Sequence, residues 1–159
     1  MAAVEDDMWY YRALHARVWR SLRDSGLSAT AHILDAGCGT GGLIKRLGPL
    51  MSSWTWMGVD VHPAACVLAR ERVGVTIAQA DLTRLPFGDE GFDAVVSADV
   101  IYHIEDDQRA LAEMGRVLRP GGLLVINVPA YRWLWSYHDA AVQSCRRYGR
   151  WELRAKLQA

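Results

Sequence analysis

Short apolar runs recur along the chain, separated by segments in which apolar residues recur at helical spacing. Continuous apolar runs of this length, bounded by turn residues, indicate strands buried on both faces. Such runs are the one that opens at Ile33, then residues 54–60, 75–80, 92–97 and 123–128. The segments between them predict helices, so the pattern predicts strands and helices in alternation.

The first predicted helix spans residues 8–23, where Leu14, Val18 and Leu22 recur close to every 3.6 residues. Further helices are predicted after the first strand, from Pro63 with Ala64, Val67 and Leu68 facing the core, over 106–119, and over 151–157. This alternation favours a doubly wound α/β fold, in which a Rossmann-like, mostly parallel sheet carries helices on both faces.

The first strand ends in a glycine-rich turn that reads Asp35-Ala36-Gly37-Cys38-Gly39-Thr40-Gly41-Gly42. Glycine lets a ligand approach the backbone and adopts positive φ without a steric penalty. Gly37, Gly39 and Gly42 satisfy the dinucleotide spacing, which predicts a pyrophosphate and hence a nicotinamide dinucleotide (NAD). Asp35 favours another ligand, because its carboxylate would repel a pyrophosphate but attract the ammonium group of S-adenosylmethionine (SAM).

An acidic residue stands at or just after the end of each of the first four predicted strands. These residues are Asp35, Asp60, Asp81 and Asp99. In open α/β sheets ligands bind at the carboxyl ends of the strands. One such Asp is readily explained as a helix cap or a surface charge, but four in succession favour a binding site.

A chain of 159 residues suffices for a single domain. Its 18 basic and 18 acidic residues give no net charge, so no overall field favours nucleic acid or an anionic membrane. The three cysteines, Cys38, Cys66 and Cys145, show no disulfide framework, which favours free thiols. Residues 1–7 lack the features of a signal peptide, and the longest apolar run, 123–128, is too short to span a membrane. We therefore expect a cytoplasmic protein.

Several motifs together resemble a class I SAM-dependent methyltransferase of the bacterial small-molecule type, similar to methyltransferase types 11 and 12. They are the glycine turn, Asp60, Ala80-Asp81-Leu82, residues 92–97, and Arg116-Val117-Leu118-Arg119-Pro120-Gly121-Gly122. The resemblance covers residues 33–129. It implies that SAM is the cofactor, that S-adenosylhomocysteine is the product, and that the methyl group moves by in-line displacement to a small-molecule acceptor.

The resemblance also implies which residues bind SAM. The methionine part would lie on the glycine turn, Asp60 would bind the ribose hydroxyls, and Asp81 would accept from the adenine amino group. Val61 would pack on the adenine face, and Leu82 would donate its backbone N–H. The expected cofactor-binding residues are Asp35, Gly37, Cys38, Gly39, Asp60, Val61, Asp81, Leu82, Ala98 and Arg12.

The segment after the fourth strand, Asp99-Val100-Ile101-Tyr102-His103-Ile104, resembles the family segment where SAM and acceptor meet. His103 is the candidate general base, although a histidine that merely orients the loop fits as well. Many relatives have Glu where this chain has Tyr102, so we expect no metal-assisted mechanism and no metal.

Two flanking segments resemble one bacterial subgroup of the family. Trp9-Tyr10-Tyr11-Arg12 is similar to the start of a helix that lies over the SAM pocket as a lid. Residues 129–148 are similar to the segment after the fifth strand. Tyr102, Trp135, His138, Arg146 and Arg147 are the expected acceptor-binding residues, with the two arginines binding an anion; packing aromatics and solvated arginines are the alternative.

We expect one domain over residues 1–159, with a lid (1–30), a cofactor-binding core (31–129) and an acceptor-side segment (130–159). The family fold has seven strands and only five are found, so the chain is expected to be C-terminally truncated or a compact variant. The fifth strand would then be an exposed edge, open to a homodimer. A non-catalytic SAM-binding module and an NAD-dependent oxidoreductase remain alternatives.

Overall fold

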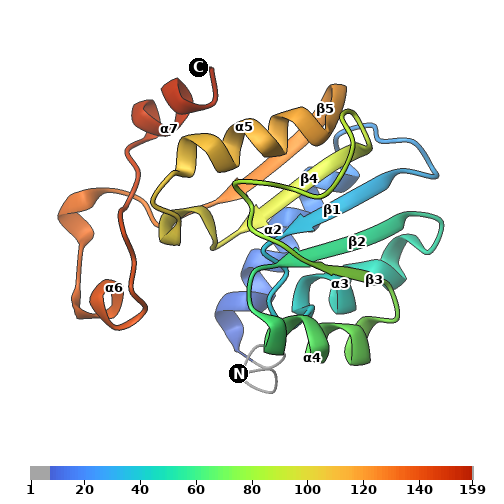
Figure 1. Ribbon diagram of the computed structural model, residues 1–159, viewed down its shortest axis with the longest axis horizontal. Coiled ribbons are helices and arrows are strands. Elements are labelled where there is room, and N and C mark those ends of the chain that lie inside the picture. Colours follow the sequence, from blue (N-terminus) through green and yellow to red (C-terminus); the bar gives the residue numbers. More distant parts are fainter. Residues whose placement is uncertain (1–7, 159) are drawn as a thin grey trace.

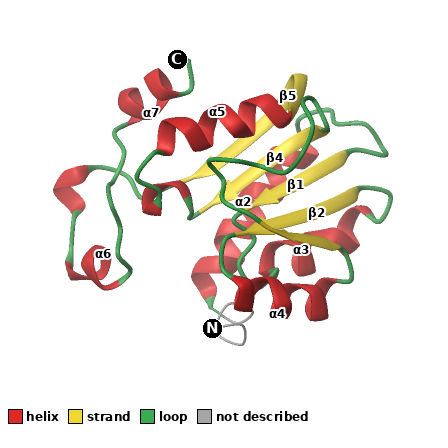
Figure 2. Cartoon of the chain, in the orientation of Figure 1, coloured by secondary structure: helices red, strands yellow, loops and turns green. Residues whose placement is uncertain are grey.

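A computed structural model describes residues 8–158 and shows a five-stranded, fully parallel sheet in the order β3-β2-β1-β4-β5 (Figures 1 and 2). The strands are β1 (His32–Ala36), β2 (Thr55–Asp60), β3 (Thr76–Gln79), β4 (Phe92–Ala98) and β5 (Leu118–Asn127). The order reverses at β1, as in doubly wound folds. The predicted fold class and its five strands are confirmed.

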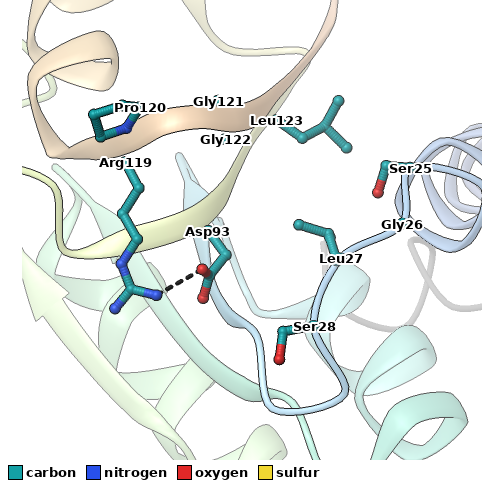
Figure 3. Close-up of a pocket in the computed structure, with 10 residues that line it drawn as sticks. All are labelled: Ser25, Gly26, Leu27, Ser28, Asp93, Arg119, Pro120, Gly121, Gly122 and Leu123. Carbon is teal, nitrogen blue, oxygen red and sulfur yellow. Dashed lines mark hydrogen bonds and ion pairs between the residues drawn. The ribbon is translucent and has the colours of Figure 1, made fainter.

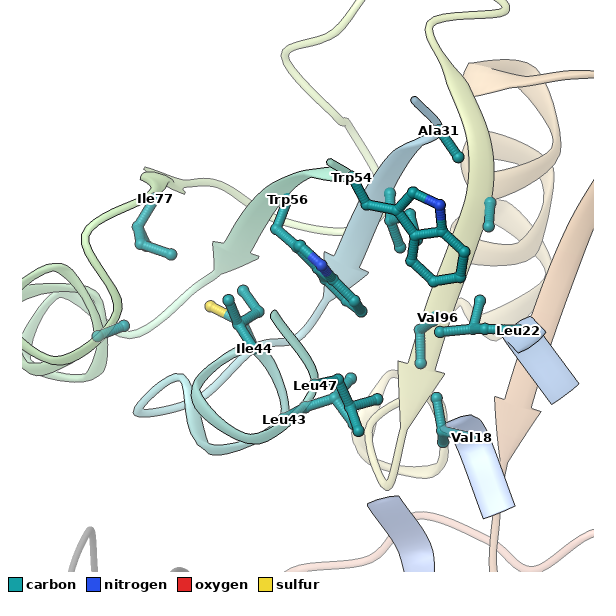
Figure 4. Packing of buried hydrophobic residues seen from close by; sticks show 14 of the residues in the cluster. Val18, Leu22, Ala31, Leu43, Ile44, Leu47, Trp54, Trp56, Ile77 and Val96 are labelled. Carbon is teal, nitrogen blue, oxygen red and sulfur yellow. The ribbon is translucent and has the colours of Figure 1, made fainter. Parts of the chain in front are cut away.

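Helices cover both faces of the sheet, and each face has its own apolar core. On one face lie α2 (Trp9–Arg23), α3 (Gly42–Leu47) and α4 (Pro63–Val73), and α5 (Asp107–Val117) covers the other. Figure 4 shows Leu22 of α2 and Leu43 and Leu47 of α3 beside the sheet and the indole rings of Trp54 and Trp56. Alternation along each strand divides the apolar side chains between the two cores.

The phase of α4 differs from the prediction. Cys66 and Ala69 face the core, whereas Val67 and Leu68 are 51% and 42% exposed. Residues 64–69 are all apolar, so no periodic pattern marked the inner face. Close packing sets which face of α4 points inward. A β-carbon at Gly41 would lie 3.4 Å from the β-carbon of Ala69, so only a small residue fits at position 69.

The boundary between α5 and β5 also differs from the prediction. The helix ends at Val117, and β5 begins at Leu118 rather than at 123. Leu118 pairs with Phe92, and after a register shift Leu123 pairs with Ala94. Gly121, with φ of +76°, lies inside this irregularity. Pairing with β4 therefore extends the strand through residues that, taken locally, signal a turn.

After β5 the chain makes an excursion that we call the arm, residues 130–148. It contains η3 (Arg132–Leu134) and α6 (Tyr137–Ala141), and Figure 1 shows it projecting from the sheet. A parallel bridge between Ala130 and Tyr148 closes its base. There the Tyr148 N–H donates to the Pro129 carbonyl at 3.0 Å, and the Tyr148 carbonyl accepts from the Tyr131 N–H at 2.9 Å. The predicted helix beyond it is confirmed as α7 (Arg150–Lys156).

A buried carboxylate on α5 anchors the arm and α7. The side chain of Asp107, 3% exposed, accepts from the Tyr148 hydroxyl at 2.8 Å and pairs with Arg146 at 3.0 Å and Lys156 at 2.9 Å. Burial acts to raise the pKa of Asp107, but the bonds from Lys156 and Tyr148 outweigh it and lower that pKa. The C-terminal segment is thus fastened to α5, where the Gln108 amide also donates to the Lys156 carbonyl at 2.9 Å.

No helix within residues 8–158 is long and apolar enough to cross a membrane. The cytoplasmic location stays a prediction. Cys38, Cys66 and Cys145 are all free thiols, as expected.

Candidate functional site

The carboxyl ends of the strands bring the predicted acids to one edge of the sheet. Asp35 lies near the end of β1, Asp60 is the last residue of β2, Asp81 follows β3, and Asp99 follows β4. Asp35 is buried between Gly58 of β2 and Val96 of β4. The topology therefore sets the four carboxylates along one edge, beside the switch point where such folds bind ligands.

The glycine turn is held against the end of β2 by its backbone. The N–H groups of Gly37 and Cys38 both donate to the Val59 carbonyl, at 2.8 and 2.9 Å. Gly37 has φ of +89°, and a β-carbon there would collide with the methyl groups of Val100. Gly39 has φ of +52°, yet a β-carbon there would meet nothing within 4 Å. The turn is therefore closely packed at Gly37 and open at Gly39, where a ligand could approach the backbone.

Asp60 joins the glycine turn to the chain after β2. One carboxylate oxygen accepts from the Gly39 N–H at 2.8 Å, and the other accepts from the His62 N–H at 2.9 Å. A carboxylate oxygen has two acceptor positions, so each oxygen keeps one for a ligand hydroxyl. Because both oxygens are already oriented, a ribose diol would be bound with little reorganisation.

Cys38 contributes only its backbone to this edge. Its side chain is buried, and a β-carbon at Gly58 would lie 2.9 Å from the Cys38 sulfur. Burial, and after it the charges of Asp35 and Asp60, raise the pKa of the Cys38 thiol well above its usual range. A thiolate nucleophile at this position is therefore strongly disfavoured.

The expected adenine side of the site is partly exposed. Val61 is 53% exposed directly after Asp60, so its side chain offers an apolar surface to a planar ring. Asp81 is exposed, and one of its oxygens accepts from the Thr83 N–H at 2.8 Å and the Thr83 hydroxyl at 2.9 Å. The Leu82 side chain is buried, which leaves its backbone as the only group it could offer to a ligand.

An ion pair on α5 holds the loop that follows Asp81. Glu113 accepts from the Leu85 N–H at 2.8 Å and pairs with Arg116, whose guanidinium donates to the Phe87 carbonyl at 2.9 Å. The hydrogen bond from Arg116 lowers the pKa of Glu113 to about 2 despite partial burial. This contact ties the adenine-side loop to the core.

Asp99 connects three elements above the site. It has φ of +60°, and its carboxylate accepts from the Tyr10 hydroxyl at 2.7 Å and the Asn127 amide at 2.6 Å. Tyr10 lies in the first turn of α2, so this bond places the start of the predicted lid helix at the carboxyl ends of β4 and β5. Arg12 is exposed on the same helix, and Ala98 pairs with Asn127. From the sequence, Tyr10 was expected only as part of the lid segment, and Asn127 was missed, although its place at a strand end was a visible signal.

His103 lies in the short helix η2 (Ile101–His103), exposed and facing the arm. Its Nδ1 is 3.4 Å from the Gln143 carbonyl, and its ring lies 4.1 Å from that of Tyr102. Burial, then the charge of Asp99, raise the pKa of Tyr102 to about 12. With Nδ1 donating to Gln143, the unprotonated Nε2 would be left to accept a proton.

The two arginines expected to bind an anion are engaged within the protein. Arg146 pairs with Asp107 and donates to the Glu105 carbonyl at 2.7 Å. Arg147 pairs with the buried Asp139 at 2.7 Å. Their charges are already compensated, so these contacts favour a structural role over anion binding. Trp135 is 45% exposed and His138 is exposed on α6.

A hollow shown in Figure 3 lies at the opposite end of the strands. It is lined by Ser25–Ser28, Asp93 and Arg119–Leu123, and Arg119 pairs there with Asp93 at 2.6 Å. Asp93 also accepts from the His32 N–H at the start of β1. The main charged groups of the hollow, Arg119 and Asp93, thus neutralise each other. They lie at the amino ends of the strands, whereas the four carboxylates lie at the carboxyl ends.

Within residues 8–158, no three His, Cys, Asp or Glu side chains gather in a way that could hold a metal ion. The sequence-based expectation that no metal takes part stays a prediction.

The fold and this edge are typical of one class of protein. Its members are doubly wound α/β domains that offer a glycine turn and acidic strand ends to a nucleoside-type ligand. A family model described as "Methyltransferase domain" matches residues 34–126. The chain belongs to this methyltransferase family, which implies SAM as the methyl donor.

Two relatives of the chain are named as methyltransferases. The chain is 37% identical over 124 residues to the "Probable tRNA methyltransferase 9B" of Bos taurus, covering 75% of this chain and 26% of that protein. It is 33% identical over 120 residues to the "Ubiquinone/menaquinone biosynthesis C-methyltransferase UbiE" of Hahella chejuensis, covering 69% of this chain and 48% of that protein. The chain thus spans half or less of these relatives.

Among solved structures, the chain is similar to one of a Haloferax volcanii methyltransferase in complex with the Trm112 methyltransferase activator. The TM-score is 0.80 at 23% identity, covering 98% of this chain and 71% of that chain. This similarity supports the fold.

The residues present fit SAM. The backbone at Gly39 is open, Asp60 keeps acceptor positions for a diol, and Val61 exposes an apolar surface beside it. The individual ligand contacts expected from the sequence stay predictions.

We predict that Gly39→Ala weakens SAM binding roughly tenfold or more, because the added methyl group enters the space over the turn. The positive φ should also cost about 1 kcal/mol of unfolding free energy. Gly26→Ala is the matched control, since Gly26 has φ of +75° and no atom near a β-carbon but lies outside the site. Calorimetric titration and urea unfolding separate the two effects. Equal SAM affinity in both variants would contradict the placement of the ligand.

Proposed function

We propose that this chain binds SAM at the carboxyl edge of the sheet and transfers its methyl group to a small-molecule acceptor. The observation that carries the proposal is Asp60, whose two oxygens are oriented by the N–H groups of Gly39 and His62. The same carboxylate fixes the glycine turn and retains acceptor positions for a ribose. A non-catalytic SAM-binding module is the alternative, and it predicts binding without turnover.

When bound, SAM supplies a methyl group on a sulfonium that is displaced in line, so that the acceptor atom gains the carbon while the bonding electron pair goes to sulfur. The protein's part is then alignment and exclusion of water, which is worth roughly 7–11 kcal/mol for well-oriented reactants. The start of α2, held by the bond from Tyr10 to Asp99, would cover the site. His103 would take the acceptor's proton at Nε2, with Nδ1 held by the Gln143 carbonyl.

A small molecule is the proposed acceptor because the chain has no net charge and its two most conspicuous arginines are paired internally. The similarity to UbiE, named for quinone biosynthesis, supports this choice. The similarity to a tRNA methyltransferase makes tRNA the competing acceptor.

We expect the chain to bind SAM and S-adenosylhomocysteine and to bind NAD far more weakly. Asp60→Ala should weaken SAM binding by roughly tenfold to a hundredfold, the worth of a hydrogen bond to a charged group. Calorimetric titration of folded protein measures this. Asp93→Ala is the control, since Asp93 also accepts a backbone N–H but at the other end of the strands. If Asp60→Ala and Asp93→Ala bind SAM alike, the ribose contact is wrong.

We further predict that His103→Gln lowers kcat by roughly 10²- to 10⁴-fold with SAM affinity unchanged, as expected for loss of a general base. Release of S-adenosylhomocysteine is followed with a panel of phenolic and quinol acceptors and, in parallel, with bulk tRNA. His32→Gln is the control, because His32 is exposed at the amino end of β1, away from the proposed site. Unchanged kcat in His103→Gln would leave His103 only a role in loop packing, and turnover of tRNA alone would replace the small-molecule proposal.

We also propose a homodimer through β5. This strand is the last of the sheet, and all its side chains are half-buried or exposed, whereas most of those of β4 are buried. An unpaired strand edge can accept a second copy. Light scattering should then give twice the chain mass of 17.8 kDa. A monomer across the accessible concentration range would rule the dimer out.

A further inference from the structure

The arm exposes an unusual density of large side chains. Within seven residues, Tyr131 and Trp135 are about half-exposed, while Trp133 is 78% and Tyr137 89% exposed. Leu134 is also exposed, at 45%. Exposed apolar groups scattered singly are ordinary, but a concentration of them marks an interaction site.

An ordered scaffold presents these side chains. Ser136 caps α6, and the Asp139 carboxylate accepts from the Ser136 N–H at 2.8 Å and pairs with Arg147. The bridge between Ala130 and Tyr148 closes the base. The rings of Tyr131 and Trp133 stack with their centroids 6.0 Å apart. The aromatic groups are therefore held outward by polar contacts within the arm rather than by a core of their own.

Charge distinguishes the arm from the remainder of the chain, whose 15 basic and 17 acidic residues leave it slightly acidic. The arm contains three arginines and a single carboxylate, Asp139, and Arg150 follows it at the start of α7. The Asp139 side chain is 3% exposed and paired with Arg147.

Arg146 is paired with Asp107, which leaves Arg132 as the exposed cation of the arm. Arg150, just beyond the arm on α7, is also exposed, and its guanidinium lies 5.7 Å from the centre of the Trp151 ring. The surface of the arm is thus aromatic and cationic, with no exposed carboxylate.

We propose that the arm docks on an anionic lipid surface. Trp and Tyr prefer the boundary between headgroups and acyl chains, and nearby arginines gain energy from anionic lipids. Single-stranded RNA also favours aromatic and basic surfaces, but it requires a row of phosphate contacts. Two exposed arginines supply few such contacts, and Leu134 cannot stack on a base as an aromatic ring does. The apolar content of the arm therefore favours lipid.

Docking would bring the candidate site close to the lipid. The Cys145 N–H donates to the Tyr102 carbonyl at 2.9 Å, and Arg146 donates to that of Glu105 at 2.7 Å, so the arm is fixed to η2 and the loop after it. Such docking could deliver an apolar acceptor from the lipid to His103, a role that rests on the proposed function. The docking proposal itself does not depend on that function.

The test is co-sedimentation of the full chain with phosphatidylcholine vesicles, with and without phosphatidylglycerol, together with SAM titration of the same samples. We expect binding to the anionic vesicles and a blue shift of tryptophan emission. Trp133→Ala combined with Tyr137→Ala should lower the partition coefficient roughly tenfold or more, from the lost apolar area. Arg132→Gln combined with Arg150→Gln should abolish the preference for anionic vesicles. Neither pair belongs to the proposed SAM site, so SAM affinity should be unchanged.

Leu50→Ala combined with Val67→Ala is the control, because Leu50 and Val67 are 52% and 51% exposed on η1 (Gly48–Met51) and α4, outside the arm. A partition coefficient equal to that of the unaltered chain supports the proposal. Folded protein that binds neither kind of vesicle overturns it, as does a loss of binding in the control variant as large as that in the arm variant. Tighter binding to oligouridine than to anionic vesicles would assign the arm to RNA instead. Because SAM affinity is measured separately, failure of docking and failure of the methyltransferase proposal are distinguishable.

Discussion

The site depends on the hydrogen bonds that fasten the glycine turn to the end of β2. Two N–H groups of the turn share the Val59 carbonyl, and a third binds the Asp60 carboxylate. These bonds join the first and second strands at the edge where a ligand would bind. A side chain is excluded at Gly37 by contact with Val100, whereas at Gly39 a β-carbon would meet no atom and only the positive φ opposes it. The residue proposed to bind ribose is therefore also the residue that shapes the turn.

A second set of contacts fastens the C-terminal part of the chain, including the arm, to α5. Asp107 on α5 gathers Tyr148, Arg146 and Lys156, and Asp139 gathers Arg147. Burying a carboxylate is favourable only when it is paired and hydrogen-bonded, and both of these are. The arginines that look free in the sequence are thus engaged internally: Arg146 fixes the arm to α5 and the loop before it, and Arg147 joins α6 to the base of the arm. Their neutralisation leaves the aromatic residues as the main chemical feature of the arm's surface.

The two proposals are linked by geometry but rest on different evidence. The proposed methyl-transfer site is formed by strand ends that the parallel topology brings together, whereas the proposed lipid-docking surface is formed by one continuous segment. The contacts of Cys145 and Arg146 with the loop around His103 connect them. An enzyme that presents its acceptor side to a lipid surface would suit an acceptor with low solubility in water. The proposed SAM edge of the sheet lies beside the start of α2, through the bond from Tyr10 to Asp99.

The sequence alone determined the strands, the glycine turn and the acidic strand ends, because each depends on a local pattern: a continuous apolar run, glycine at fixed spacing, one residue past a strand. It predicted the order of elements and hence the edge that holds Asp35 and Asp60. Only the tertiary structure decided which face of α4 points inward, because its apolar residues lie on every side. Close packing of the glycine turn against Ala69 sets that face. Pairing with Phe92 decided where β5 begins. The partners of Asp99, Arg146 and Arg147 are likewise set by contacts between distant segments, which no local pattern specifies.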